Sequence, residues 1–314
     1  MADLADLRER ITTLTAGHTR PRMIDGVQVY ATTRTTAPIG SVAEPVVALV
    51  AQGAKRTLLG DRAFGYAAGQ FLVVTIDLPL TGYITAASDD EPFVAASLRL
   101  DPAVIAQLLL ESHLDAVMPG AGGTGSGGAG LSTGGPALAV SDADPELIDS
   151  FARLLTLVGS PVDRRILGPA VRREIHWRLL TGPQGGLVRQ IGVAGSRVAV
   201  VSRAIAWLRE HYDQVIRIED LAAEVTMSVS SLNRHFRAAT SMSPLQYQKQ
   251  IRLQRARARL LADPGDIAGT GHAVGYTSAS QFTREYRRLF GASPGEDVVR
   301  LRHAHLELSE SGAR

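Results

Sequence analysis

The chain has 314 residues, of which 45% are hydrophobic and 20% are charged, so it is long enough for more than one domain with a core. Its formal net charge of +2 excludes no class of partner by itself. The sequence contains no cysteine, which excludes disulfides, thiolate metal sites, a cysteine nucleophile and a thiol-based redox sensor.

The first residues are typical of a charged amphipathic helix. Leu4, Leu7, Ile11 and Leu14 recur at spacings of three and four, and they predict a helix over residues 1–17. The segment has no apolar signal region, and no apolar run in the chain approaches the roughly 18 residues of a membrane span. We therefore expect a cytoplasmic, nucleoid-associated protein without a membrane segment.

From about residue 24 to residue 100 the pattern changes to short β-rich runs. These runs cover 27–30, 45–50, 71–76 and 93–98, and turn signals at 59–62 and 80–82 separate them. Several short strands with no helix between them predict a small antiparallel sandwich or barrel. Asp101 and Pro102 then predict the N-cap and first residue of a helix.

The middle of the chain alternates loose segments with helices. Residues 119–136 are rich in glycine and serine but lack the flanking elements of a phosphate-binding loop, so they predict a flexible linker. Helices are predicted from Asp144 to about 158 and over about 168–180, and a loose stretch is predicted from there to about 196. From Arg197 onward the chain is predicted to be helical almost to its end.

Two features of this first part stay open between a functional and a structural interpretation. The apolar stripe on the helix over 145–158 either forms a dimer face or packs on the barrel. The aromatic residues of the predicted strands either line an effector pocket or fill the core; they are Tyr30, Phe64, Tyr66, Phe71, Tyr83 and Phe93.

The last third of the chain contains one pattern twice. The first copy covers 230–237 and ends at the Ser-Pro pair 243–244, and the second covers 280–287 and ends at the Ser-Pro pair 293–294. In both copies an apolar residue precedes the proline by 12 positions. Self-similarity at matched spacing indicates two duplicated structural units.

Each copy predicts an amphipathic helix that follows a shorter helix, over about 218–225 or 266–274, across a tight turn. This is the helix-turn-helix arrangement, whose second helix enters the major groove of DNA. The polar stripe of each second helix carries the residue types that bond base edges and phosphates. These candidate DNA-binding residues are Ser230, Asn233, Arg234 and Arg237 in the first unit, and Ser280, Thr283, Arg284 and Arg287 in the second.

Positive charge is concentrated in the same segment. Between residues 226 and 294, ten basic residues oppose three acidic ones, a net charge of +7 that leaves −5 for the rest of the chain. A basic module on an acidic remainder is typical of phosphate binding. Ser243 and Pro244 predict the start of a helix to about 262, roughly 28 Å long, which is close to the roughly 34 Å of one DNA turn. Such a rod would place the two units in successive major grooves.

These residues resemble the DNA-binding domain of the AraC/XylS family. The resemblance is carried by 219–222, 227–236, 243–247, 252–256 and 274–291, and it covers about residues 200–300. It implies two helix-turn-helix units in successive major grooves. It also implies base contacts by Ser230, Asn233, Arg234, Ser280, Thr283 and Arg284, and contacts to the DNA backbone by Arg237 and Arg287.

The first half resembles the N-terminal domain of AraC-type regulators, a cupin-like barrel that binds a small effector or mediates dimerisation. The resemblance is carried by 52–61, 78–82, 100–102 and 173–183. It implies an α+β multidomain fold: an N-terminal β-barrel with flanking helices, then an all-α domain with two helix-turn-helix units. The expected domains are 1–196, with the barrel over about 20–100 and helices over 144–180, and 197–306, with units over about 218–239 and 266–290.

The expected function is that of a sequence-specific transcription regulator controlled by a small-molecule effector. The expected partners are double-stranded promoter DNA, RNA polymerase, the effector and a second copy of the chain.

Two features depart from the family pattern. Gly269 and Gly271 stand in the first helix of the second unit, where each costs about 1 kcal/mol relative to alanine, so we expect this unit to be less rigid. Thr226 stands where a turn glycine is common. Because a β-branched residue disfavours a positive φ, we expect the first turn to be strained or differently shaped.

An enzymatic barrel is the alternative, since many cupin-like barrels hold a catalytic metal. Between Thr19 and Ser112 the sequence has no histidine or cysteine, and its acidic residues do not cluster on a strand. We therefore expect no metal, no cofactor and no enzymatic activity. A sugar- or aldehyde-processing cupin enzyme with an accessory nucleic-acid module would bind stoichiometric metal, and a metal assay would separate it from a regulator.

Overall fold

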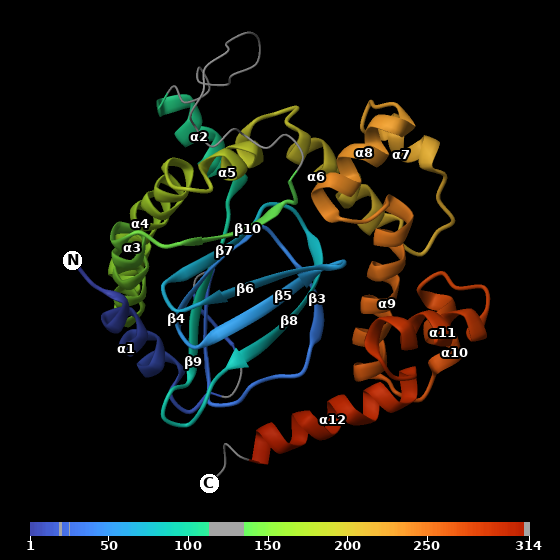
Figure 1. Ribbon diagram of the computed structural model, residues 1–314, viewed down its shortest axis with the longest axis horizontal. Helices are drawn as coiled ribbons and strands as arrows, with labels where there is room; N and C mark the ends of the chain where they lie inside the picture. Colours follow the sequence, from blue (N-terminus) through green and yellow to red (C-terminus); the bar gives the residue numbers. More distant parts are fainter. Residues whose placement is uncertain (19–20, 25, 113–134, 311–314) are drawn as a thin grey trace.

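The computed structural model describes residues 1–18, 21–24, 26–112 and 135–310. Figure 1 shows two lobes side by side, one built from sheets and helices and one entirely helical. The linker predicted over 119–136 lies outside the described residues except for its last two. The α+β class with a helical C-terminal part is confirmed.

The chain begins with α1 (Leu4–Thr15), as its apolar spacing predicts. The carboxylate of Asp3 accepts hydrogen bonds from the backbone N–H groups of Ala5 and Asp6, at 2.8 and 2.9 Å, and so caps the helix. Leu7 and Ile11 are fully buried against the larger sheet, which fixes this helix on the sheet-rich lobe.

The sheet-rich lobe contains two antiparallel sheets. The larger has the strand order β1 (Arg22–Ile24), β2 (Val27–Thr32), β9 (Phe93–Arg99), β4 (Val46–Gln52), β7 (Gln70–Val74) and β10 (Leu138–Asp142). The smaller has the order β3 (Ile39–Ala43), β8 (Leu78–Ala86), β5 (Ala54–Leu59) and β6 (Arg62–Ala67). Among the described strands the sheets do not join into a closed barrel. The arrangement is a sandwich that fits a cupin-like jelly roll.

One predicted turn is correct and one is wrong. Residues 59–62 join β5 to β6, and Gly60 supplies the left-handed backbone of that turn with φ +58°. Residues 80–82, in contrast, lie inside β8, where Thr81 pairs with Gly40 on β3. Gly82 leaves room beside the strand rather than forming a turn, since a Cβ there would lie 3.2 Å from Cε of Lys55.

Helices cover the outer face of the larger sheet. They are α2 (Pro102–Ser112), which Asp101 caps through the N–H of Ala103 at 2.8 Å, α3 (Pro145–Thr156), a short 3-10 turn (Leu157–Gly159), α4 (Pro161–Thr181) and α5 (Gly185–Gly192). The apolar stripe of α3 packs into the core of this lobe, where Phe151 is fully buried. The stripe therefore packs against the sheet-rich lobe and does not form a dimer face.

Two helix boundaries differ from the prediction. Ser160 caps α4, so this helix begins at Pro161 rather than near 168 and continues through Pro169. The stretch predicted to be loose contains α5, because Gly185 allows a close approach of the backbones. A Cβ on Gly185 would lie 2.2 Å from the carbonyl oxygen of Leu180.

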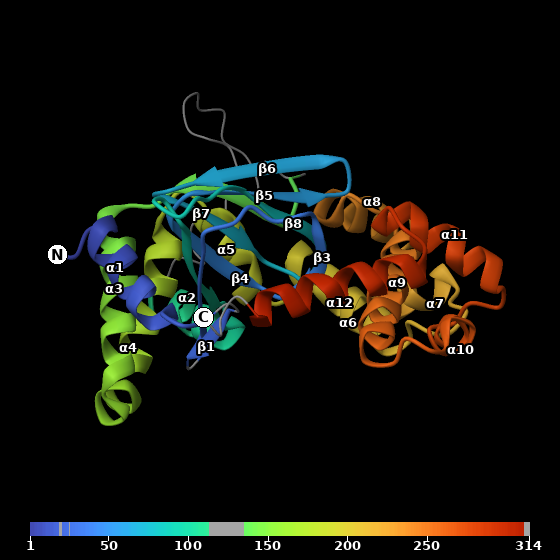
Figure 2. The same ribbon diagram turned by 90° about the horizontal axis from the view of Figure 1, so that it is seen from below.

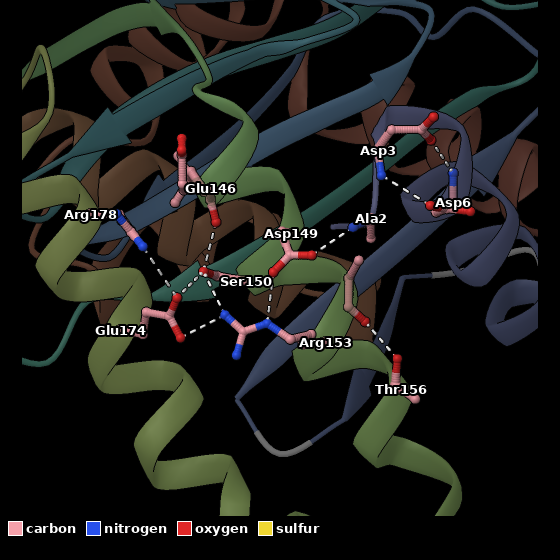
Figure 3. A network of polar contacts seen from close by, with 12 residues as sticks. Ala2, Asp3, Asp6, Glu146, Asp149, Ser150, Arg153, Thr156, Glu174 and Arg178 are labelled. Atoms are coloured by element: carbon pink, nitrogen blue, oxygen red, sulfur yellow. Dashed lines mark hydrogen bonds and ion pairs between the residues drawn. The ribbon is translucent and has the colours of Figure 1, made fainter.

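A polar network fastens α3, α4 and the N-terminus together (Figure 3). Arg153 on α3 bonds Asp149 at 2.8 Å and Glu174 of α4 at 2.6 Å, and the hydroxyl of Ser150 also donates to Glu174. Asp149 accepts the backbone N–H of Ala2 at 2.6 Å. Partly exposed pairs of this kind stabilise weakly one by one, so we regard the network as fixing helix positions.

The helical lobe confirms the helices predicted from Arg197 onward. It contains α6 (Arg197–Glu210), α7 (Ile218–Glu224), α8 (Val229–Thr240), α9 (Pro244–Ala262), α10 (Ile267–Ala273), α11 (Ala279–Phe290) and α12 (Pro294–Glu310). Ser243 and Gln246 form a capping box at the start of α9, whose bounds match the predicted rod.

Polar bonds join the first half of the helical lobe to the sheet-rich lobe at Asp77 and Ala137. The guanidinium of Arg209 pairs with Asp77, and the hydroxyl of Tyr247 donates to the carbonyl oxygen of Asp77 at 2.8 Å. The N–H of Ala137, just before β10, donates to the carbonyl of Ala239 near the end of α8 at 2.9 Å. The first repeat unit is therefore bonded directly to the sheet-rich lobe.

No single described helix is both long and apolar enough to cross a membrane. The pair α5 and α6, bent by 58° at its break, meets the length and composition criteria only when the two helices are taken together.

Candidate nucleic-acid interface

Each repeat unit consists of a short helix, a turn and a longer amphipathic helix. In the first unit α7 leads into α8, and in the second α10 leads into α11. The apolar faces of the longer helices are buried: Leu232 and Phe236 on α8, and Phe282 and Tyr286 on α11, are fully buried. Because one face of each helix is fixed in the core, the opposite face is held toward solvent.

On α8, three of the four predicted site residues are exposed. Ser230, Arg234 and Arg237 project to solvent, and neither arginine has a hydrogen-bond or ion-pair partner among the described residues. Asn233 is half-buried, and its side-chain amide donates to the carbonyl of Val229 within the same helix at 3.0 Å. The two arginines are thus the cations on this face that are free to meet a phosphate or a base.

On α11, the corresponding residues are arranged in the same way. Ser280, Arg284 and Arg287 are exposed, whereas Thr283 is half-buried and donates to the carbonyl of Ala279 at 3.0 Å. Arg284 has no described partner. Arg287 lies 3.4 Å from the exposed carboxylate of Glu296, a contact that solvent screens.

The helix α9 sets the relative position of the two units. It contacts both α8 and α11, which lie beside different parts of its length in Figure 1 and on the same side of the lobe in Figure 2. Arg252 on α9 joins the second unit to the segment that precedes α7, because its guanidinium donates to the carbonyls of Tyr212 and Gln214 at 2.5 and 2.8 Å and of Gly275 at 2.9 Å. The exposed stripes therefore lie on one rigid scaffold.

The turns of the two units share a left-handed position, which different residues occupy, and the second turn is one residue longer. Gly275 has φ +89°, and Thr226 at the equivalent place has φ +58°. The expected strain in the first turn is therefore present, and a β-branched residue bears it. Packing explains the glycine at position 271, since a Cβ there would lie 3.0 Å from the ring of Phe282. At the equivalent positions, the first unit has Ala222 and the smaller side chain of Leu232.

Several basic residues of this segment are held by partners within the lobe, which the sequence pattern did not reveal. Arg257 is buried against Asp297 at 2.7 Å, and Lys249 donates to Glu285 at 2.9 Å. Arg252 serves the backbone carbonyls described above. The net charge of the segment therefore overstates the charge that faces solvent.

The sheet-rich lobe contains a second candidate site, a cavity of about 1160 Å³ between the two sheets. Of the aromatic residues left open above, Tyr30, Tyr66, Tyr83 and Phe93 line it, whereas Phe71 belongs to the core on the outer face of the larger sheet. Within the described ranges, no group of three or more histidine or acidic side chains is placed to hold a metal ion.

Comparison with known proteins gives two family matches. The model described as the AraC-type transcriptional regulator N-terminus matches residues 23–187, and a helix-turn-helix domain model matches residues 221–300. The HTH-type transcriptional activator RhaS of Pectobacterium carotovorum is 28% identical over 101 residues, which is 32% of this chain and 36% of RhaS. The chain thus spans about a third of the length of this curated relative.

Solved structures show the fold. ToxT from Vibrio cholerae is 10% identical with a TM-score of 0.54, over 87% of this chain and 97% of ToxT. A ToxT structure with an unsaturated fatty acid bound has a TM-score of 0.50 at 10% identity, over 88% of this chain and 96% of ToxT. At this identity the likeness concerns the fold alone.

Proposed function

The chain belongs to the AraC/XylS family of regulators with an AraC-type N-terminal domain, and on that premise we propose that it regulates transcription by binding specific promoter DNA. The observation that carries the proposal is the pair of exposed arginines, Arg234 and Arg284, held at equivalent places on α8 and α11. Arginine in a recognition helix bonds guanine bidentately, and two such helices on one scaffold suit successive major grooves.

In the proposed assignment, Ser230, Arg234, Ser280 and Arg284 contact bases, with Asn233 and Thr283 released from their own helices on binding. Arg237 and Arg287 contact phosphates. Breaking the weak bonds from Asn233 to Val229 and from Thr283 to Ala279 costs little, because base edges replace the carbonyl acceptors.

We propose that the sheet-rich lobe, divided from the DNA-binding part at about residue 196, holds a small effector in the cavity between its sheets. The support is that β3 and β8 line this cavity and also contact α9. A ligand that shifts these strands would change the position of α9, and with it the position of both recognition helices relative to the sheet-rich lobe. The fatty acid bound to ToxT supports small-molecule binding in a protein of this fold.

The proposal includes RNA polymerase as the partner that the bound regulator recruits or blocks, and a cytoplasmic location beside the nucleoid. A homodimer is also proposed, and it would have to use a surface other than the stripe of α3, which is buried. RhaS is named as a transcriptional activator, and no observation on the described residues favours the alternative cupin enzyme.

Single substitutions at the two exposed arginines test the proposal. Arg234→Ala and Arg284→Ala are each expected to weaken binding to a specific duplex by about 1–3 kcal/mol, the cost of one bidentate base contact. The duplex is recovered by selection from a random pool with the full chain, and affinity is measured by fluorescence anisotropy at several salt concentrations.

The matched control is Arg34→Ala, which removes the same charge from an exposed position in the sheet-rich lobe. Its affinity for the selected duplex is expected to stay within error of the unsubstituted chain. Unchanged affinity in both recognition-helix variants, or an equal loss in the control, would count against the proposed face.

A further inference from the structure

The cavity between the two sheets has a largely apolar wall. The larger sheet contributes Val50, Leu72, Val74 and Phe93, and the smaller contributes Leu80. A hollow of about 1160 Å³ with such a lining suits a ligand with an extended apolar body.

The amine of Lys55 is the exception on the inner face of the smaller sheet. Lys55 lies on β5, and its cross-strand partner on β6 is Tyr66. Two positions along β5, Thr57 also lines the cavity, and its hydroxyl lies 3.5 Å from that of Tyr66. Gly82 on β8 leaves room for the lysine side chain. Lys55, Thr57 and Tyr66 therefore form a polar corner beside the apolar residues named above. The other basic side chains of the lining lie on the larger sheet or on α4 behind it; they are Arg99, Arg172 and His176.

The ammonium group has no counter-charge among the described residues. Two carboxylates line the cavity, and each has other partners: Glu44 pairs with Arg99 at 3.1 Å, and Asp101 caps α2. Burial lowers the pKa of Lys55, and no neighbouring charge opposes this shift. A desolvated cation without a partner is costly, so the site gains most from a ligand that brings a negative charge.

The choice of lysine is notable in this chain. Only two of its 33 basic residues are lysines. The other, Lys249, pairs with the buried carboxylate of Glu285 at 2.9 Å. Both lysines therefore occupy places where a compact single charge meets, or can meet, one carboxylate.

We propose that the cavity binds an apolar carboxylic acid whose carboxylate pairs with the ammonium of Lys55 and accepts hydrogen bonds from Thr57 and Tyr66. One ammonium balances one negative charge, whereas a phosphate dianion would leave a charge unbalanced beside the aliphatic wall. A sugar would leave most of its hydroxyls facing that wall without partners. The inference deepens the proposed function by naming the chemical class of the effector.

Calorimetric titration of the full chain with decanoate, in the absence of DNA, tests this pairing. Decanoate is expected to bind, and Lys55→Met is expected to weaken its binding about tenfold to a hundredfold, the usual loss for a hydrogen bond to a charged group. Arg56→Met is the matched control, because Arg56 is exposed on the other face of the same strand and should leave binding unchanged. Decanamide, which has the same length without the charge, is expected to bind at least tenfold more weakly than decanoate.

Chemical labelling gives a second readout that needs no variant. Reductive methylation with formaldehyde and cyanoborohydride, followed by peptide mass spectrometry, reports on both lysines. Decanoate is expected to protect Lys55 and to leave the labelling of Lys249 unchanged.

In the titration, the pairing is overturned if decanoate fails to bind, if decanoate binds the Lys55→Met variant as tightly as the unsubstituted chain, or if decanamide binds as tightly as decanoate. In the labelling experiment, it is overturned if Lys55 is methylated equally with and without decanoate. None of these measurements contains DNA. A failure here therefore leaves the proposed DNA contacts standing, and a failure of the arginine variants leaves this pairing standing.

Discussion

Asp297→Ala is expected to lower the free energy of unfolding of the helical lobe by about 3–5 kcal/mol, the usual cost of breaking a buried ion pair from one side. The carboxylate is fully buried on α12 and receives two bonds from Arg257 of α9, at 2.7 and 3.0 Å. Tyr286 and Arg300 donate to it at 2.9 and 2.6 Å. Without the carboxylate, the guanidinium of Arg257 stays buried with no partner for its charge.

Urea unfolding followed by circular dichroism measures this loss, with Glu296→Ala as the control. Glu296 is the neighbouring acid on the same helix but is exposed, so a much smaller change is expected. Burial alone would raise the pKa of Asp297, but the bonds from Arg257, Arg300 and Tyr286 hold it below its usual value. A carboxyl whose pKa is lowered on folding stabilises the folded state at pH values above its pKa in the unfolded chain. The difference in the free energy of unfolding between the variant and the unsubstituted chain should therefore shrink as the pH falls below about 4. A difference independent of pH, or no loss at all, would contradict the assignment.

Gly275→Ala is expected to destabilise the second unit by roughly 3 kcal/mol or more. Its φ of +89° already costs a side-chain-bearing residue about 1–2 kcal/mol. In addition, the new Cβ would lie 2.2 Å from the carbonyl oxygen of Asp213, and backbone cannot move away as a side chain would. Because Arg252 bonds the carbonyl of Gly275, the displacement should also weaken DNA binding by disturbing the spacing of the units.

The equivalent turn of the first unit supplies a control in which glycine is introduced rather than removed. Thr226 is exposed and has φ +58°, so Thr226→Gly relieves strain without removing a buried contact. Thermal unfolding should show a gain of up to about 1 kcal/mol, reduced by the greater freedom of glycine in the unfolded chain. A stable Gly275→Ala protein, or a destabilised Thr226→Gly protein, would show that the two turns are not equivalent.

The helical part of the fold could be predicted from the sequence because its signals are local. Ser228, Ser243 and Ser278 each cap the helix that follows, and the apolar spacing of the recognition helices leaves one stripe polar. The same signals predicted which candidate residues are exposed in both units. Asn233 and Thr283 proved half-buried, which a stripe pattern cannot resolve, because the width of the buried face depends on neighbouring helices.

The parts that were mispredicted depend on contacts between distant segments. Gly82 resembles a turn residue, yet it lies in a strand to make room for the side chain of Lys55. Gly185 resembles a loop residue, yet it allows α5 to approach the end of α4. Lys55 itself carried no signal, because nothing in a sequence tells a solvated lysine from one that faces a hollow between two sheets.

The claim that two equivalent helices read successive major grooves is tested most directly by hydroxyl-radical footprinting of the full chain on its selected duplex. Two protected patches on one face of the DNA are expected, centred about 10 base pairs apart. Arg284→Ala should weaken one patch, and Arg234→Ala the other. A single patch that both variants weaken equally, or protection without regard to sequence, would contradict the assignment of the two helices.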